Sequence, residues 1–251
     1  MFGHRADGKK VKNLEPLFRV IPSIMLERND AQVYFKQDIP LKAIDEYISK
    51  KAEEGIRMSY MNIIYAGLVR IIKERPKLNR FVMNGTTYQR NEINVSLSIK
   101  KSLTDEGQET VIKIPFNGTE NIFEIKEKLD ATIEKNKDKE MVNKTDKVVK
   151  ILNLIPNVMI LWTVKILRFL DKHGIMPKAI IKASPFHTSV FLTNVGSLGI
   201  DSIYHHIYNF GTTSLFFSMG KKKKSYIYDE DEIKEEKCIT IAFVGDERIC
   251  D

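Results

Sequence analysis

The pattern of apolar and polar positions predicts a mixture of helices and strands along the first third of the chain. Residues 33–39 form an extended apolar segment, and Pro40 precedes an amphipathic helix over 41–52. A second helix is expected over 59–73, before Pro76. The side chains expected to be buried are Leu41, Ile44, Tyr47 and Ile48 in the first helix, and Ile63, Ile64, Leu68, Ile71 and Ile72 in the second.

The next segment contains a hairpin signal and a strand. Asn84-Gly85 lies between residues 81–83 and 86–90, and this dipeptide is typical of tight β-hairpin turns. Residues 93–99 alternate strictly between apolar and polar, which predicts a strand with one apolar face. Residues 111–114 are a further strand candidate, and a helix is expected over 122–133.

The second half of the chain is predicted to start with an apolar helix over 151–170 and to continue as strands. Strand candidates are residues 188–193, 212–219, 225–228 and 238–244, with Lys221–Lys224 as a solvated hairpin turn. Because helices and strands do not alternate regularly, we expect an α+β fold. It should have one mixed, mostly antiparallel sheet of five or six strands, covered by helices on one face.

Composition narrows the classes of protein. The chain has 251 residues, and we find neither repeats nor a linker, so residues 1–251 are expected to form a single domain. The net charge is +7, but basic and acidic residues are interleaved, which argues against a nucleic-acid interface. Two late cysteines and a charged N-terminal segment without an apolar signal indicate a reduced, cytoplasmic protein.

The apolar segment 151–170 is not expected to span a membrane. It contains Pro156, Lys165 and Arg168, and a spanning helix needs a cleaner run of about 20 apolar residues. With Lys172, the two cations form a narrow basic edge. This leaves three roles open: packing on its own subunit or on a neighbour, docking of a partner protein, and peripheral binding to a membrane.

Common nucleotide and metal motifs are missing from the sequence. Gly196-Ser-Leu-Gly199 is too short for a phosphate-binding loop. His205 and His206 are adjacent, so their side chains point in different directions and no metal is expected. Two other segments stand out, namely the glycine-rich end of a strand at 191–199 and the acidic tip that follows a strand at 243–251.

These two segments resemble motifs of one family. The first is similar to the T-[IV]-S-N-[LV]-G stretch of dihydrolipoamide acyltransferase catalytic domains from 2-oxo acid dehydrogenase complexes. The second, with Asp246, Arg248 and Asp251, resembles their D-H-R-x-x-D-G motif, which chloramphenicol acetyltransferases carry as H-x-x-x-D-G. Glu247 occupies the histidine position. The resemblance runs from about residue 15 to the end. It implies a two-layer chloramphenicol acetyltransferase-like sandwich. Compared with the family, the chain is expected to lack a lipoyl domain and the C-terminal helix.

The resemblance implies an acyltransferase that moves a small acyl group between coenzyme A and a thiol or hydroxyl acceptor. In the family a histidine takes the proton of the thiol, and a hydroxyl stabilises the oxyanion. Carried over by position, the catalytic candidates are Glu247, Thr193 and Asp251, with Asp251 as the structural aspartate. The candidates for binding coenzyme A are Asn194, Gly196 and Ser197.

Glu247 leaves two interpretations open. A carboxylate with an ordinary pKa of about 4.3 is a poor base for a thiol whose pKa is about 8.5. Either the chain is active, with Glu247, His205 or His206 as the base, or it is a silent domain that binds coenzyme A or a partner. In the family the histidine loop faces the hydroxyl segment of a neighbouring subunit. We therefore expect a homotrimer with Glu247 and Thr193 at a subunit boundary.

Overall fold

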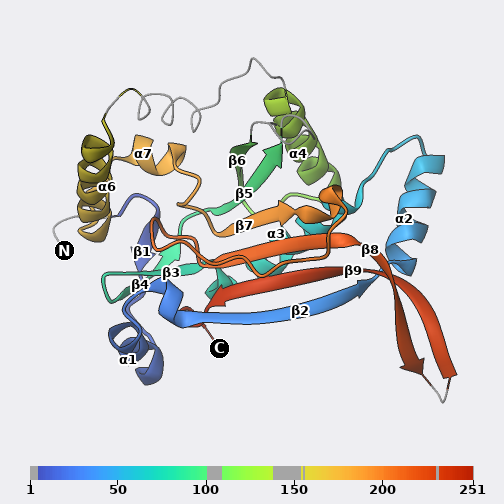
Figure 1. The fold of residues 1–251 in the computed structure, drawn as a ribbon, viewed down its shortest axis with the longest axis horizontal. Coiled ribbons are helices and arrows are strands. Elements are labelled where there is room, and N and C mark those ends of the chain that lie inside the picture. The colour runs from blue at the N-terminus through green and yellow to red at the C-terminus, as the bar shows by residue number, and fades with distance from the viewer. Residues whose placement is uncertain (1–4, 101–108, 138–153, 155, 230–231, 251) are drawn as a thin grey trace.

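The computed structural model describes residues 5–100, 109–137, 154, 156–229 and 232–250. Its centre is a six-stranded sheet in the order β2-β9-β8-β7-β5-β6 (Figure 1). The strands are β2 (Gln32–Pro40), β5 (Ile93–Lys100), β6 (Glu109–Phe116), β7 (Val190–Asn194), β8 (Leu215–Asp229) and β9 (Glu232–Asp246). The pairs β5·β7 and β7·β8 are parallel and the others antiparallel. The prediction of a mixed α+β sheet is confirmed.

A second, three-stranded sheet differs from the expectation of a single sheet. It has the order β1-β4-β3 and is formed by β1 (Gly8–Lys10), β4 (Thr86–Arg90) and β3 (Arg80–Met83). The hairpin between β3 and β4 turns at Asn84 and Gly85, whose φ angles are 51° and 67°. Positive φ at both turn positions is what Asn-Gly favours, so the hairpin is confirmed although it belongs to its own small sheet.

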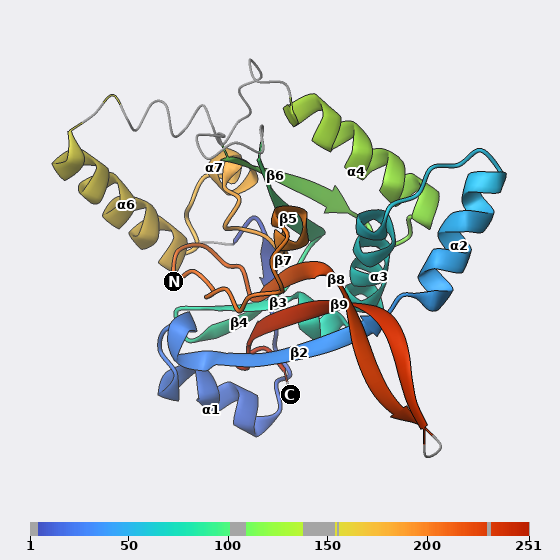
Figure 2. The same cartoon turned by 45° about the vertical axis from the view of Figure 1, so that its right-hand side comes forward.

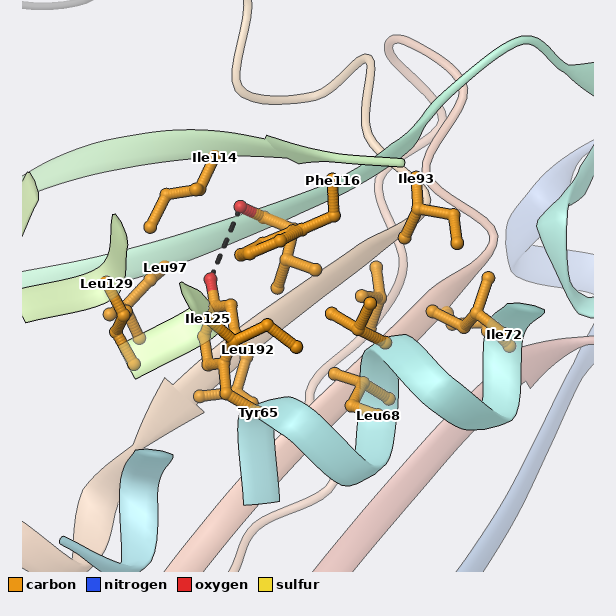
Figure 3. Packing of buried hydrophobic residues seen from close by; sticks show 14 of the residues in the cluster. Tyr65, Leu68, Ile72, Ile93, Leu97, Ile114, Phe116, Ile125, Leu129 and Leu192 are labelled. Atoms are coloured by element: carbon orange, nitrogen blue, oxygen red, sulfur yellow. Dashed lines mark hydrogen bonds between the residues drawn. The ribbon is translucent and has the colours of Figure 1, made fainter. Parts of the chain in front are cut away.

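Two helices cover one face of the large sheet. They are α3 (Tyr60–Glu74), which begins at a capping box of Ser59 and Asn62, and α4 (Ile122–Lys137). Tyr65, Leu68 and Ile72 of α3 point into the core (Figure 3), and the Tyr65 hydroxyl donates to the carbonyl of Val95. Ile71 was predicted to be buried but is 51% exposed, because it turns away from the face that carries Tyr65 and Leu68.

The remaining helices lie around the sheet. They are α1 (Pro16–Ile24), α2 (Lys42–Glu53), α6 (Asn157–Lys172) and α7 (Lys178–Ala183), with 3-10 turns η1 (Arg28–Ala31), η2 (Pro76–Asn79) and η3 (Val195–Leu198). In Figures 1 and 2, α6 lies at one end of the molecule and α2 at the other. Of the predicted helix 151–170, residues 151–153 and 155 lie outside the described part.

The predicted turn at Lys221–Lys224 is wrong, because these lysines lie inside strand β8. Lys222 pairs with Ile239 and Lys224 with Lys237, after a register shift that follows Met219. Opposite charges and an aromatic ring accommodate the lysines there. The ammonium of Lys223 lies 3.5 Å from a carboxylate oxygen of Asp38 and 3.5 Å from one of Asp201, and Lys222 lies over the ring of Tyr60. Pairing along a long two-stranded ribbon therefore outweighs the turn preference of a charge run.

Candidate functional site

Thr193 lies at the carboxyl end of β7, where the strand pairs with Ser218 of β8. Its side chain is half-buried, and its hydroxyl has no hydrogen-bond partner among the described residues. The Ser218 hydroxyl, in contrast, is fully buried and accepts a hydrogen bond from the backbone N–H of Ile203. The Thr193 hydroxyl is therefore available to donate a hydrogen bond at the end of a buried strand.

The turn after Thr193 is held by its own side chains. The Asn194 amide oxygen accepts a hydrogen bond from the N–H of Ser197 at 3.3 Å, and the Ser197 hydroxyl donates to the Asn194 carbonyl at 2.7 Å. Gly196 lies directly against the bulged part of β8, since a Cβ there would stand 2.4 Å from the carbonyl oxygen of Gly220. Asn194, Gly196 and Ser197 thus have structural roles in this turn, and their binding of coenzyme A stays a prediction.

His205 lies over the same face of the sheet as Thr193. Thr193 and Phe191 share one face of β7, and Phe191 is paired with Phe216 of β8. The His205 ring stacks flat on the Phe216 ring, with 4.1 Å between centroids and 5° between planes. The loop that carries His205 therefore covers the face of the sheet opposite α3 and α4.

The hydrogen bonding of His205 defines its tautomer. Its Nδ1 atom lies 2.8 Å from the carbonyl oxygen of His206, and because a carbonyl only accepts, Nδ1 carries the proton. Burial lowers the pKa of His205 below its ordinary value, although the hydrogen bond to His206 opposes that shift. At neutral pH the ring is therefore uncharged with a lone pair on Nε2, which is the form that can accept a proton.

At the end of β9, Asp246 and Arg248 form a buried ion pair. The Arg248 Nε and Nη2 atoms donate to the two Asp246 carboxylate oxygens at 2.7 and 2.8 Å. Arg28 lies 3.5 Å from the same carboxylate through its Nε atom, and burial lowers the pKa of Arg28 despite that neighbouring charge. Such two-pronged pairing fixes the loop that follows β9.

Glu247 lies between Asp246 and Arg248 in sequence, but its side chain takes no part in their ion pair. Its backbone N–H donates to the carbonyl of Ala31 at 2.9 Å, so its position along the chain is held. Its half-buried carboxylate has no partner among the described residues. Asp251, the third catalytic candidate, lies outside the described residues.

The structure does not bring Glu247 and Thr193 together within one subunit. Strand register places Thr193 level with Ser218 and Ala242 on neighbouring strands. Glu247 lies five positions beyond Ala242, which is about 16 Å along the strand, and two strands, about 10 Å, across the sheet. The two candidates therefore lie at opposite ends of the strands.

A cavity of about 620 Å³ opens beside the Glu247 loop. Cations from three parts of the chain line it, namely Arg28, Arg168, Lys172 and Arg248, together with the acids Glu27 and Asp171. Arg28 and Arg248 are paired with Asp246, so the exposed Arg168 and Lys172 are the lining cations that can attract a negatively charged or strongly polar ligand. No group of three His, Cys, Asp or Glu side chains suited to a metal ion is found in the described part of the chain.

Sequence reasoning missed a buried charge network at this end of the sheet. Arg5 contacts Asp171, which in turn is hydrogen-bonded to His187, and His187 Nδ1 lies 2.8 Å from the Ser184 hydroxyl. This order of serine, histidine and aspartate is that of a hydrolytic triad, yet the His187 side chain is 0% exposed. A substrate cannot reach it, so the network holds the fold. Its members are far apart in the sequence and do not form a recognisable motif.

Lys113 is a further buried cation that the sequence did not single out. Its ammonium donates to the backbone carbonyls of Ile181, Ser184 and His187. Burial lowers its pKa to about 8. By tying three carbonyls together, Lys113 fixes the segment that leads from α7 into β7, and hence the strand that ends at Thr193.

Comparison with known proteins identifies the fold. No family model matches the sequence, and no curated protein matches it. Among solved structures, a probable dihydrolipoamide acetyltransferase from Listeria monocytogenes is 15% identical, with a TM-score of 0.57 over 97% of this chain and 88% of that one. The dihydrolipoamide acetyltransferase of Azotobacter vinelandii is 9% identical, with a TM-score of 0.57 over 97% and 86%.

A chloramphenicol acetyltransferase also matches, with 11% identity and a TM-score of 0.55 over 97% of this chain and 92% of that one. The chain therefore has the α+β fold of dihydrolipoamide acetyltransferase catalytic cores and chloramphenicol acetyltransferase, as the sequence resemblance implied. At this level of identity the comparison establishes the architecture, whereas function has to be argued from the site.

Proposed function

We propose that this protein is an acyltransferase that moves a small acyl group between coenzyme A and a thiol or hydroxyl acceptor. The observation that carries the proposal is the Thr193 hydroxyl at the end of β7, which has no hydrogen-bond partner in the part of the chain that the structure describes, in a fold shared with acetyltransferases. A hydroxyl in that state can donate to the oxyanion that forms when a thioester is attacked. Such a donor accelerates acyl transfer because it acts on the transition state.

The proposed base is Glu247 of a neighbouring subunit in a homotrimer. Glu247 is too far from Thr193 in its own chain, and its carboxylate is without a partner among the described residues. The solved Azotobacter protein has a serine, a histidine and an asparagine in its catalytic mechanism, with the asparagine four positions after the histidine. Here Thr193 offers the hydroxyl, and Asp251 follows Glu247 by four positions.

Coenzyme A is the proposed acyl carrier, with Asn194, Gly196 and Ser197 as candidates for its binding. The cavity beside Arg248 lies at the Glu247 end of the strands, so only a neighbouring subunit of the proposed trimer would bring it to the turn that these three residues form. Its exposed cations Arg168 and Lys172 suit coenzyme A, which is a polyanion. A specific observation favours a second candidate for the base. His205 is neutral, its Nε2 has no hydrogen-bond partner among the described residues, and it lies on the same sheet face as Thr193. With His205 as base, one subunit would hold both groups.

The alternative function is a catalytically silent domain that binds coenzyme A or a partner protein. It is supported by Glu247 at the position where the related motif has histidine. Acetyl transfer from acetyl-coenzyme A to a dithiol, measured beside calorimetric binding of coenzyme A, separates the two functions. Turnover that is lost in Thr193→Ala supports the enzyme. Binding without turnover in the wild type and in Glu247→His supports a silent domain that binds coenzyme A. The absence of both contradicts the enzyme and the coenzyme A-binding domain, and leaves the partner-binding domain.

The identity of the base follows from single variants in the same assay. If Glu247 is the base, Glu247→Gln abolishes turnover and His205→Gln leaves it unchanged. If His205 is the base, His205→Gln abolishes turnover and Glu247→Gln leaves it unchanged. If only Glu247→His is active, the acyl-transfer site is preserved and the wild type lacks a general base. The added imidazole should then raise the rate by about 10² to 10⁴, which is what general-base catalysis typically contributes.

A further inference from the structure

Helix α6 exposes apolar side chains along most of its length. Val158, Leu161 and Trp162 are 64%, 63% and 60% exposed, and Met159, Ile166 and Phe169 are more than half exposed. Asp171, next to the last residue, is the only buried side chain of the helix. Within the described residues, no helix combines the length and the apolarity required to cross a membrane. Exposed apolar surface of this size needs a partner.

The exposed side of α6 is divided into two stripes. Successive residues of an α-helix are rotated by about 100°, so Val158, Phe169, Trp162, Ile166 and Met159 share an arc of about 100°. Lys165, Arg168 and Lys172 share the adjoining arc, with Leu161 among them. No acidic residue stands on this exposed side, because the only acid of the helix is the buried Asp171. The helix thus presents an apolar stripe beside a purely basic one.

The carboxyl end of α6 is anchored to the rest of the protein. An Asp171 carboxylate oxygen accepts a hydrogen bond from Arg5 at 2.7 Å, and its second oxygen lies 3.1 Å from Nε2 of His187. The Asp171 carbonyl accepts a further bond from Arg5. The anchored end fixes how the helix is presented, and Figures 1 and 2 show α6 at the outer edge of the molecule. At this anchored end Arg168, Phe169 and Lys172 also line the cavity beside Arg248, and the rest of the two stripes faces away from the protein.

The dimensions and charges of α6 fit the surface of a membrane. Its 16 residues span about 24 Å, which is shorter than the hydrocarbon core of about 30 Å, so the helix can lie in the interface plane but not cross it. Apolar side chains beside lysine and arginine are the pattern of interfacial helices. Trp162 has the Lys165 ammonium 4.9 Å from its ring centre, and both residue types are suited to the headgroup region.

A protein partner fits these stripes less well. It would have to offer a row of acidic groups opposite Lys165, Arg168 and Lys172. A second copy of α6 cannot do so, since its exposed side has none. The chain also carries a net charge of +7. We propose that α6 docks this protein on anionic membranes, with the apolar stripe among the acyl chains and the basic stripe on the lipid headgroups.

Trp162 is the only tryptophan of the chain and lies in the middle of the proposed contact, so its fluorescence reports on docking. The full-length protein is mixed with vesicles of phosphatidylcholine alone or with 30% phosphatidylserine. We expect a blue shift and co-sedimentation with the anionic vesicles, weakened by salt, and little of either with the neutral ones. Absence of a shift with anionic vesicles at low salt overturns the proposal.

Two matched pairs of variants locate the contact. Ile166→Glu should weaken vesicle binding roughly tenfold or more, whereas Ile71→Glu on α3, equally exposed, should leave it unchanged. The double variant Lys165→Gln, Lys172→Gln should weaken it about 25-fold, since each cation near an anionic leaflet is worth about fivefold. Its control is Lys42→Gln, Lys50→Gln on α2 at the other end of the molecule, with the same loss of charge.

The competing occupant is a second copy of the chain. Light scattering in the absence of lipid tests it, with circular dichroism to show that each variant is folded. An oligomer that Ile166→Glu dissociates, together with no vesicle binding by the wild type, assigns the apolar stripe to a subunit interface and overturns the proposal. Equal loss of vesicle binding in a variant and its control also overturns it, because the contact would then not be on α6.

Discussion

Asp171 and His187 are joined by a hydrogen bond of 3.1 Å inside the protein, where both side chains are almost completely excluded from solvent. Burial alone would raise the pKa of Asp171. The hydrogen bond from His187 and the electrostatic attraction of His187 and Arg5 outweigh burial, so the pKa of Asp171 lies below its ordinary value. One carboxylate thus ties the N-terminal segment, the end of α6 and the start of β7 to one another.

We expect Asp171→Asn to destabilise the protein strongly. The substitution keeps the shape but removes one of the two carboxylates that compensate buried Arg5, the other being Asp7. Breaking a buried pair costs up to about 3–5 kcal/mol when the remaining charge has no partner, so the loss should approach but not exceed that size. Urea unfolding measures the loss. Glu74→Gln is the matched control, because Glu74 pairs with Arg70 on the exposed surface of α3 at a similar distance of 2.8 Å. It should leave the free energy of unfolding almost unchanged, because an exposed ion pair is screened by solvent. Equal effects in the two variants would contradict the role of the buried network.

A second prediction concerns acid stability and Glu120. Burial tends to raise the pKa of this carboxyl, but hydrogen bonds from Lys128 and from the backbone N–H groups of Asn117 and Gly118 lower it to about 2. A depressed pKa means that the stabilisation is complete above the ordinary value of 4.5 and is lost as the pH falls toward 2.

We therefore expect Glu120→Gln to be less stable than the wild type at pH 6, and the difference to shrink between pH 4.5 and 2. Urea unfolding at several pH values gives both curves. A difference that stays constant down to pH 2 would mean that Glu120 acts through shape and not through its charge.

A third prediction compares two glycines. Gly196→Ala would place a Cβ 2.4 Å from the carbonyl of Gly220, so the turn after Thr193 must shift away from β8. Overpacking of this kind costs about 1–3 kcal/mol. Gly67 lies on the exposed side of α3 with nothing within 4 Å of the added Cβ. Gly67→Ala should instead stabilise the helix by about 0.5–1 kcal/mol. Thermal unfolding of the two variants should therefore shift in opposite directions.

The sequence predicted the structure correctly where the local pattern of residues and the tertiary packing agree. Residues 93–99 alternate, and Ile93, Val95 and Leu97 indeed face the core. Asn84-Gly85 predicted its hairpin because the two positive φ angles are a property of those residues alone. The fold class followed from the irregular order of such elements, and the segments around Thr193 and Glu247 indicated the architecture through a resemblance.

The rest depended on contacts that local sequence does not encode. Lys221–Lys224 has the composition of a turn, yet pairing with β9 keeps it in a strand. Ser96 alternates as a surface residue, but its hydroxyl is buried and donates to the carbonyl of Pro185. The separation of Thr193 and Glu247 was not visible either, because it follows from the register of three strands far apart in the chain.

That separation leads to the last prediction, a complementation between two inactive variants. In the proposed trimer each site takes Thr193 from one subunit and Glu247 from the next, so Thr193→Ala and Glu247→Gln each inactivate every site on their own. After unfolding and refolding of an equal mixture, subunits assort at random. A boundary is then intact when a Glu247→Gln chain supplies Thr193 and a Thr193→Ala chain supplies Glu247, which holds for about a quarter of boundaries.

We expect the mixture to regain about a quarter of the wild-type rate of acetyl transfer, while separately refolded variants stay inactive. If the wild type is silent, the double variant Thr193→Ala, Glu247→His is mixed with wild type instead. Only a boundary between one chain of each kind then joins Thr193 to an imidazole. A site with His205 as its base behaves differently, because Thr193 and His205 then belong to the same chain. In a mixture of Thr193→Ala and His205→Gln every chain lacks one of the two groups, so no subunit boundary can restore a site. Recovery of activity in the mixture of inactive Thr193→Ala and inactive Glu247→Gln would place the reaction between subunits. An active Glu247→Gln, together with no recovery in the mixture of inactive Thr193→Ala and inactive His205→Gln, would place it within one subunit.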